Sequence, residues 1–140
     1  MGTIENVEKS INVGLTGFEH LRRIIANIIS EEFGELYEAW CKPYPFNTVS
    51  DEEGNERLKG FYESGVLTDN DDEVIEFLFS SFQKGKLSAK GCKRLWHLIR
   101  NYNGNDDIFG SKGGAFYVCF DDFKEIVEKS AENGWKITWW

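Results

Sequence analysis

Carboxylates are the reactive side chains that are most concentrated in this sequence. Ten of its 24 acidic residues lie between residues 51 and 76, where only Arg57 and Lys59 are basic. The ten are Asp51, Glu52, Glu53, Glu56, Glu63, Asp69, Asp71, Asp72, Glu73 and Glu76. Ten acids against two bases give this segment a formal charge of −8, which equals the net charge of the whole chain. Because clustered like charges repel one another, the pattern predicts a docking surface for a positively charged partner.

Carboxylates in pairs also serve as the acid and base of glycoside hydrolases, but ten candidates without geometry select no pair. Other catalytic patterns are missing. The two histidines, His20 and His97, lie within helix-like patterns, and no G-x-S-x-G motif occurs. Residues 110–114 have the composition of a phosphate-binding loop, but their order differs from G-x-x-x-x-G-K-[ST]. We therefore expect no enzymatic activity and no cofactor.

Metal binding is not favoured by the sequence either. The three cysteines, which could bind zinc, lack C-x-x-C spacing; they are Cys41, Cys92 and Cys119. The run from Asp69 to Glu73 matches the first five positions of a calcium loop, but Val74 and Ser80 then stand where glycine and glutamate are required. Acids at the start of a helix explain the same run more simply, because they cap free N–H groups and oppose the helix dipole.

A basic segment follows the acidic one. From Phe77 to Asn105 there is no Asp or Glu. The bases there are Lys84, Lys86, Lys90, Lys93, Arg94 and Arg100. One interpretation is a nucleic-acid contact through the basic face of the helix expected at residues 88–102; the other is that this helix packs beside the acidic segment and partly neutralises it. The net charge of −8 disfavours the first, because it repels a phosphate backbone.

Composition bounds the class of protein. A chain of 140 residues with 41% hydrophobic residues and two prolines predicts one globular domain over residues 1–140. An odd number of widely spaced cysteines is typical of reduced thiols in a cytoplasmic protein. No secretory leader is apparent, and the longest apolar-rich run, residues 24–29, is too short to cross a bilayer. We therefore expect a cytoplasmic protein without a membrane partner.

Hydrophobic periodicity predicts about five helices. The first would span Gly17 to Cys41 without a break. The second would begin at the capping pattern Ser50-x-x-Glu53 and reach Glu63. The third would run from Asp69 or Asn70 to Gly85, and the fourth from the cap Ser88 to Tyr102. The fifth would be capped by Asp121 or Asp122 and end at Asn133-Gly134.

Strand signals are few. Alternation of apolar and polar residues from Trp135 to Trp139 predicts a C-terminal strand, which needs a pairing partner for its backbone groups. Ala115 to Phe120 is the first candidate and Ile11 to Leu15 the second, and residues 103–114 read as a loop. The fold class that follows is α+β, mainly α: about five helices with a small sheet that includes the C-terminal strand.

This profile of a small, acidic, aromatic-rich chain with a dense acidic segment resembles the immunity proteins of contact-dependent growth inhibition and other polymorphic toxin systems. The resemblance implies a bacterial protein that binds a cognate toxin domain, often a basic nuclease, and neutralises it by covering its active site. Tyr62 joins the ten acids in the predicted protein-binding set, with Phe61 and Val66 as further apolar anchors. The alternative without a binding function is that the acidic segment is a solvated surface whose acids cap helices. The competing function is a nucleic-acid-binding or regulatory module that uses Lys90, Lys93, Arg94, His97 and Arg100.

Overall fold

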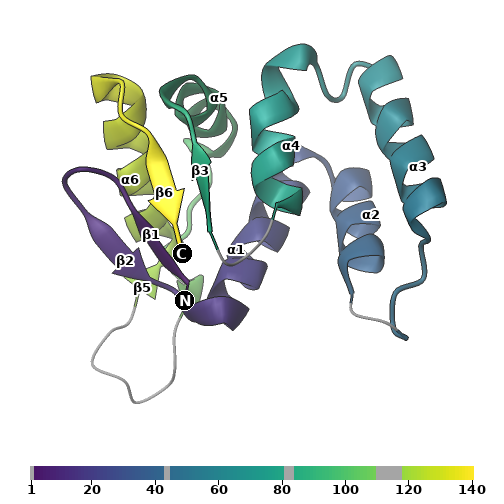
Figure 1. The fold of residues 1–140 in the computed structure, drawn as a ribbon, viewed down its shortest axis with the longest axis horizontal. Coiled ribbons are helices and arrows are strands. Elements are labelled where there is room, and N and C mark those ends of the chain that lie inside the picture. The colour runs from purple at the N-terminus through teal and green to yellow at the C-terminus, as the bar shows by residue number, and fades with distance from the viewer. Residues whose placement is uncertain (1, 43–44, 81–83, 110–117) are drawn as a thin grey trace.

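The structure is a computed structural model that describes residues 2–42, 45–80, 84–109 and 118–140. Its fold is α+β and mainly helical, and the elements are shown in Figure 1. In chain order they are β1 (Thr3–Glu5), β2 (Ser10–Asn12), α1 (Gly14–Ile29), α2 (Glu31–Cys41), α3 (Asp51–Glu63), the 3-10 turn η1 (Asp69–Asp71), α4 (Asp72–Phe79), β3 (Gly85–Leu87), α5 (Ala89–Ile99), β4 (Ile108–Phe109), β5 (Val118–Cys119), α6 (Phe120–Asn133) and β6 (Ile137–Trp139).

The C-terminal strand β6 lies inside an antiparallel sheet with the strand order β2-β1-β6-β3. Ile4 of β1 and Gly85 of β3 are both opposite Trp139, so the two ends of the chain lie close together (Figure 1). Both partners expected for this strand are therefore wrong. Residues 11 and 12 belong to the sheet but pair with β1, and Val118–Cys119 pairs with β4 in a separate two-stranded sheet. Residues 115–117 lie outside the described residues.

The long helix expected from Gly17 to Cys41 is two helices. Ser30 adopts an extended conformation (φ −167°, ψ 156°), ends α1 and caps α2 by accepting a hydrogen bond from Phe33 N at 3.0 Å. The break lets α1 and α2 pack against each other. Gly34 makes this packing close, since a Cβ there would lie 1.9 Å from Oδ1 of Asn27. The apolar period continues through Ser30, which is why the sequence pattern hid the break.

Helix boundaries elsewhere are partly as predicted. Helix α3 has its Ser50 cap and ends at Glu63 as expected, and α5 has its Ser88 cap but ends at Ile99. Helix α4 ends at Phe79, well before Gly85, because Ser80 leaves the helix in an extended conformation. Helix α6 ends at Asn133 as expected, but its N-cap is Cys119, which precedes the predicted caps Asp121 and Asp122 by less than one turn.

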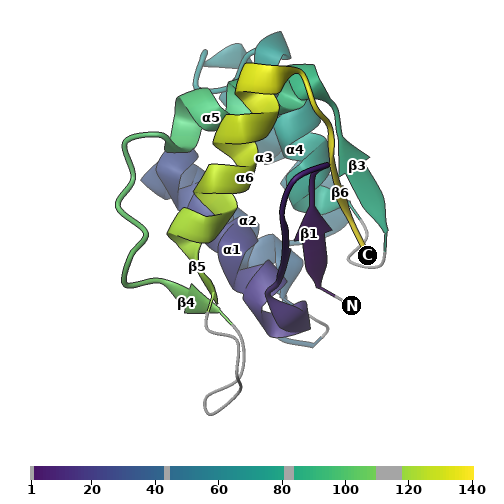
Figure 2. The same cartoon turned by 90° about the vertical axis from the view of Figure 1, so that its left-hand side faces the viewer.

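The core lies between the inner face of the four-stranded sheet and the helices. Figure 2 shows β1, β6 and β3 along one edge of the molecule, with the helices on one side of them. Trp139 points inward and meets the ring of Phe77 edge-on at 5.1 Å, and Phe77 in turn stacks with Phe123 of α6 at 6.2 Å. These three rings are at most 2% exposed. The aromatic cluster therefore ties the sheet, α4 and α6 together.

Helices α2 and α3 lie on the other side of α4 from the sheet and α5 (Figure 1). Among the elements that α3 contacts, α2 is the main one. The acidic helix is thus at the edge of the molecule, with most of its circumference in water.

Candidate functional site

Helix α3 presents an acidic outer side. Its cap, Ser50, accepts a hydrogen bond from Glu53 N at 3.2 Å, and three acids in the first turn complement the positive end of the helix dipole. Steps of four and seven residues place Glu52, Glu56 and Glu63 near one another along the helix, and all three are exposed. The local sequence therefore both starts the helix and fixes which way these carboxylates point.

The inner side of α3 is narrow. Gly54 is the only buried residue of this helix, and a Cβ there would lie 2.3 Å from the Trp40 ring of α2. Phe61 meets Phe33 edge-on at 5.4 Å, and the Trp40 indole N–H donates to the Asp51 carboxylate at 2.9 Å. These contacts fasten one side of α3 to α2, and the other side of the helix is exposed to solvent.

The second half of the acidic segment is built into the molecule. Asp71 is 1% exposed; it accepts hydrogen bonds from Thr68 N at 2.9 Å and from Arg94 Nε at 2.5 Å. Glu73 is half-buried and accepts from the Ser88 hydroxyl at 2.6 Å. Both acids thus fasten η1 and α4 to α5. The expected alternative, in which the basic helix packs beside the acidic segment, is confirmed at this contact.

Tyr62 bridges α3 and α4. Its hydroxyl donates to Asp72 Oδ1 at 2.9 Å. Burial, followed by the hydrogen bond to Asp72 and the charge of that carboxylate, raises the pKa of Tyr62 well above its ordinary value. The phenol therefore stays protonated at neutral pH and acts as a fixed donor between the two helices.

The predicted protein-binding residues fall into three groups. Eight carboxylates are exposed: Asp51, Glu52, Glu53, Glu56, Glu63, Asp69, Asp72 and Glu76. Tyr62 and Glu73 are half-buried, and Asp71 is buried. Of the other predicted anchors, Phe61 is turned toward Phe33, whereas Val66 is 43% exposed. The structure thus brings together an exposed set centred on α3 and removes Asp71 from it.

Phe46 was missed by sequence reasoning. It lies in the connection before α3 and is 70% exposed, while Val66 lies in the connection after α3. The two apolar side chains therefore belong to the segments that flank the acidic helix. An aromatic residue in a predicted loop was the available signal.

Helix α2 adds acids that the charge count concealed. Its exposed carboxylates are Glu31, Glu32, Glu35 and Glu38, and no base lies within Glu31–Cys41. The residues outside 51–76 sum to a charge of zero, because bases elsewhere in the chain balance the acids of α2. The total therefore did not reveal this local excess of acids. The α2–α3 half of the molecule is therefore acidic on both of its helices.

Helix α5, which carries the basic residues, lies on the other side of α4 from α3 (Figure 1). Lys90, Lys93, His97 and Arg100 are exposed, while Arg94 turns toward Asp71. Helix α5 itself is amphipathic as predicted, with Cys92, Leu95 and Ile99 fully buried. The molecule thus carries charges of opposite sign on two separated helices.

Within the described ranges, no group of three or more His, Cys, Asp or Glu side chains is placed to hold a metal ion. Nor is any helix in this part of the chain long and apolar enough to cross a membrane.

Comparisons with family models, with curated proteins and with solved structures found no match to this chain.

Proposed function

We propose that this protein is an inhibitor of the immunity type, which binds a basic toxin domain and covers its active site with the outer side of α3. One observation carries the proposal: α3 bears a dense set of exposed carboxylates while burying only Gly54. The apolar side chains of α3, Leu58, Phe61 and Tyr62, are only half-buried against the core, whereas a helix that contributed mainly to stability would bury such a stripe completely.

Electrostatics suit this role. A nuclease domain has a basic active-site cleft because its substrate is a polyanion, and an acidic helix can occupy the same cleft. Long-range attraction raises the association rate of such pairs, and the effect weakens as salt screens the charges. In the described part of the chain, the one ion pair within α3 joins Lys59 and Glu63 at 3.8 Å. Most of the helix's negative charge is therefore left for a partner.

Apolar anchors at the ends of α3 supply the second ingredient of a tight complex. Charge alone gives fast association, whereas slow dissociation requires apolar side chains that become buried. Phe46 and Val66, at 70% and 43% exposure, are suited to that burial. The proposed interface therefore combines the α3 carboxylates with one apolar contact at each end.

In this role the protein would act in the bacterial cytoplasm, where it would bind an incoming toxin or one that the cell itself makes. No chemical turnover is required: inhibition follows from steric exclusion of the nucleic-acid substrate. The partner to test first is the product of the adjacent gene.

The test compares two charge-reversed proteins of equal net charge. Glu52→Lys/Glu56→Lys changes the outer side of α3, and Glu8→Lys/Glu132→Lys makes the same charge change on the β1–β2 turn and on α6. All four positions are exposed. Binding to the adjacent gene product is measured by surface plasmon resonance at low and high salt. We expect the α3 variant to associate about tenfold more slowly or worse, and the control to stay within about threefold of wild type.

Equal losses in both variants would mean that net charge, and not α3, drives binding. Retention of full affinity in the α3 variant would move the interface elsewhere and overturn its assignment to α3. The outcome could also be that the wild-type protein does not bind the adjacent gene product but does bind RNA or DNA. If Lys90→Glu/Lys93→Glu then abolished this binding, the nucleic-acid-binding function of α5 would be established instead.

A further inference from the structure

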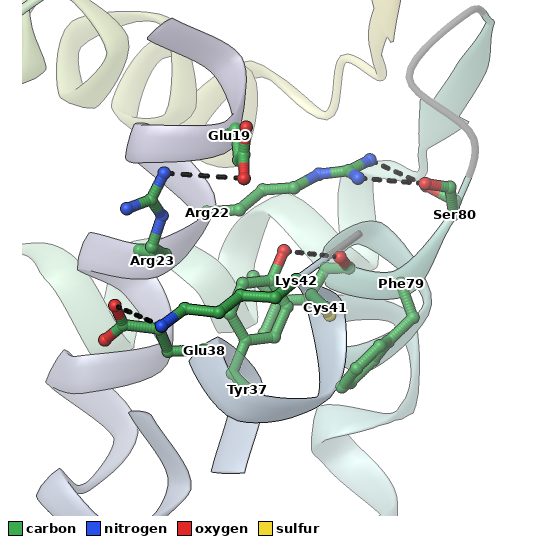
Figure 3. Close-up of a pocket in the computed structure, with 10 residues that line it drawn as sticks. Glu19, Arg22, Arg23, Tyr37, Glu38, Cys41, Lys42, Phe79 and Ser80 are labelled. Carbon is green, nitrogen blue, oxygen red and sulfur yellow. Dashed lines mark hydrogen bonds and ion pairs between the residues drawn. The ribbon is translucent and has the colours of Figure 1, made fainter. Parts of the chain in front are cut away.

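A pocket of about 520 Å³ lies between α1, α2 and the end of α4 (Figure 3). It is separate from the outer side of α3, so the inference drawn from it does not depend on the proposed inhibitor function. Its volume falls in the range of sites that take small organic ligands, about 300–1,000 Å³. None of the acids assigned to the protein-binding surface lines it.

The wall of the pocket is largely apolar. Tyr37 of α2 and Phe79 of α4 meet edge-on with ring centroids 5.3 Å apart, and Leu78 lies beside them. The Tyr37 hydroxyl donates to the Leu78 carbonyl at 3.0 Å, which fixes the ring. Aromatic and aliphatic surfaces of this kind favour a flat or short-chain apolar ligand body.

A buried guanidinium stands in the wall. Arg22 is 1% exposed, lies over the Phe18 ring at 4.5 Å, and donates to the Ser80 carbonyl at 2.9 Å and to its hydroxyl at 3.1 Å. Figure 3 shows Arg22 extending from α1 toward Ser80, while Arg23 points the other way, to Glu19. Burial removes water from this cation and lowers the pKa of Arg22. Its charge therefore acts through a medium of low dielectric on anything inside the pocket.

Two more bases line the pocket; both are partly exposed, and each is in a loose ion pair. Arg23 is 3.4 Å from Glu19, and Lys42 is 4.0 Å from Glu38. Three bases and two acids thus line a pocket in a protein whose net charge is −8. Such long, exposed pairs contribute little, so either base can turn to a better acceptor.

Cys41 completes the lining at the end of α2. The residue as a whole is exposed, but partial burial of its thiol raises the pKa to about 11, against the opposing effects of Tyr37 and Arg22. The thiol therefore stays neutral at pH 7 and adds no negative charge to the pocket.

We propose that this pocket binds a small amphipathic anion, with a carboxylate held by Arg23 and Lys42 within the field of Arg22, and an aryl or short acyl body against Tyr37, Leu78 and Phe79. Exposure sets this orientation: the side chains of Arg23 and Lys42 are 37% and 51% exposed, whereas Tyr37 and Leu78 are buried. A ligand bound there contacts α1, α2 and α4 together and therefore stabilises their packing.

The probe pair is 4-phenylbutyrate and 4-phenylbutyramide, which share a body and differ in charge. Isothermal titration calorimetry gives their affinities, and thermal unfolding gives the shift in Tm. We expect the carboxylate to bind about tenfold more tightly than the amide and to raise Tm. Arg23→Gln/Lys42→Gln should weaken the carboxylate about tenfold, whereas the matched pair Lys90→Gln/Lys93→Gln on α5 should leave it unchanged.

A second pair of variants tests the position of the site. Cys41→Trp fills the pocket without removing a charge and should abolish binding, whereas Cys41→Ser should retain it. Far-UV circular dichroism and unfolding without ligand establish that each variant is folded. Equal affinity for the acid and the amide, unchanged affinity in Arg23→Gln/Lys42→Gln, or no binding of 4-phenylbutyrate to the wild-type protein would each overturn the proposal.

Discussion

Helices α3 and α6 are almost equal in length, at 13 and 14 residues, and both begin with acids in the first turn, yet they are used in opposite ways. Helix α6 buries six residues against the core: Phe120, Phe123, Ile126, Val127, Ser130 and Ala131. Helix α3 buries Gly54 alone. The difference teaches that α6 is part of the core, whereas α3 lies on the surface of the molecule.

Polar contacts reinforce this contrast. On α6, Lys124 Nζ donates to the Tyr102 carbonyl at 2.6 Å, and Asn6 Nδ2 donates to the Ile126 carbonyl at 3.2 Å, so the helix is tied to two distant segments. On α3, the corresponding side-chain links are Trp40 to Asp51 and Tyr62 to Asp72, which join it to the adjacent helices α2 and α4. Similar substitutions on the two helices should therefore have different consequences.

The largest effect is expected from truncating an aromatic ring on each helix. Phe123 is fully buried between Phe77 and Phe120, so Phe123→Ala should lower the free energy of unfolding by about 3–5 kcal/mol. Phe61 is half-buried and packs mainly on Phe33, so Phe61→Ala should cost about 1–2 kcal/mol. Urea unfolding followed by circular dichroism measures both. Equal losses would show that α3 is as much a part of the frame as α6.

A smaller effect separates two neighbouring acids. Asp71 is buried and bonded to Arg94, so Asp71→Asn leaves a half-buried guanidinium without its charge partner and should cost about 2 kcal/mol. Asp72 is exposed, and Asn at that position still accepts the Tyr62 hydrogen bond, so Asp72→Asn should change stability by about 0.5 kcal/mol or less. The same unfolding measurement distinguishes them. A large loss of stability in Asp72→Asn, or no loss in Asp71→Asn, would contradict the assignment of Asp71 as a buried structural acid and Asp72 as a surface acid.

Local signals account for the part of this picture that the sequence could predict. The limits of α3 were predicted because Ser50 caps it and Gly65, with φ +83°, follows it. The amphipathic character of α5 and the inward alternation of Ile137 and Trp139 also come from short-range patterns. Each of these depends on residues that are neighbours in the chain.

Long-range contacts account for what the sequence could not predict. The pairing of Ile4 and Gly85 with Trp139 joins segments of three residues each, and strands that short carry little alternation. Asp71 and Asp72 are identical in type, and Asp71 is distinguished by its contacts with Thr68 and with Arg94, which is 23 residues away in the chain. The position of the acidic segment in the chain could therefore be read from the sequence, while its division into exposed and buried carboxylates required the structure.

The smallest and sharpest test uses two glycines of α3. At Gly60 a Cβ would have no neighbour within 4 Å, so Gly60→Ala should stabilise the protein by about 0.5–1 kcal/mol through helix propensity alone. At Gly54 the same gain is opposed by a Cβ 2.3 Å from the Trp40 ring, and overpacking of this kind costs about 1–3 kcal/mol. Gly54→Ala should therefore destabilise the packing of α3 against α2 by about 1 kcal/mol.

This loss should be local, because α3 is held mainly by α2. Hydrogen exchange of the α3 amides should accelerate in Gly54→Ala and slow in Gly60→Ala, while the α6 amides stay close to wild type. If Gly54→Ala instead protected α3, the contact with Trp40 would not be what holds the helix, and the acidic surface would have to be displayed by another means. Acceleration in α3 and α6 together would mean that the two helices unfold as one unit. The proposed role of α3 as a surface helix requires that α3 and α6 unfold independently.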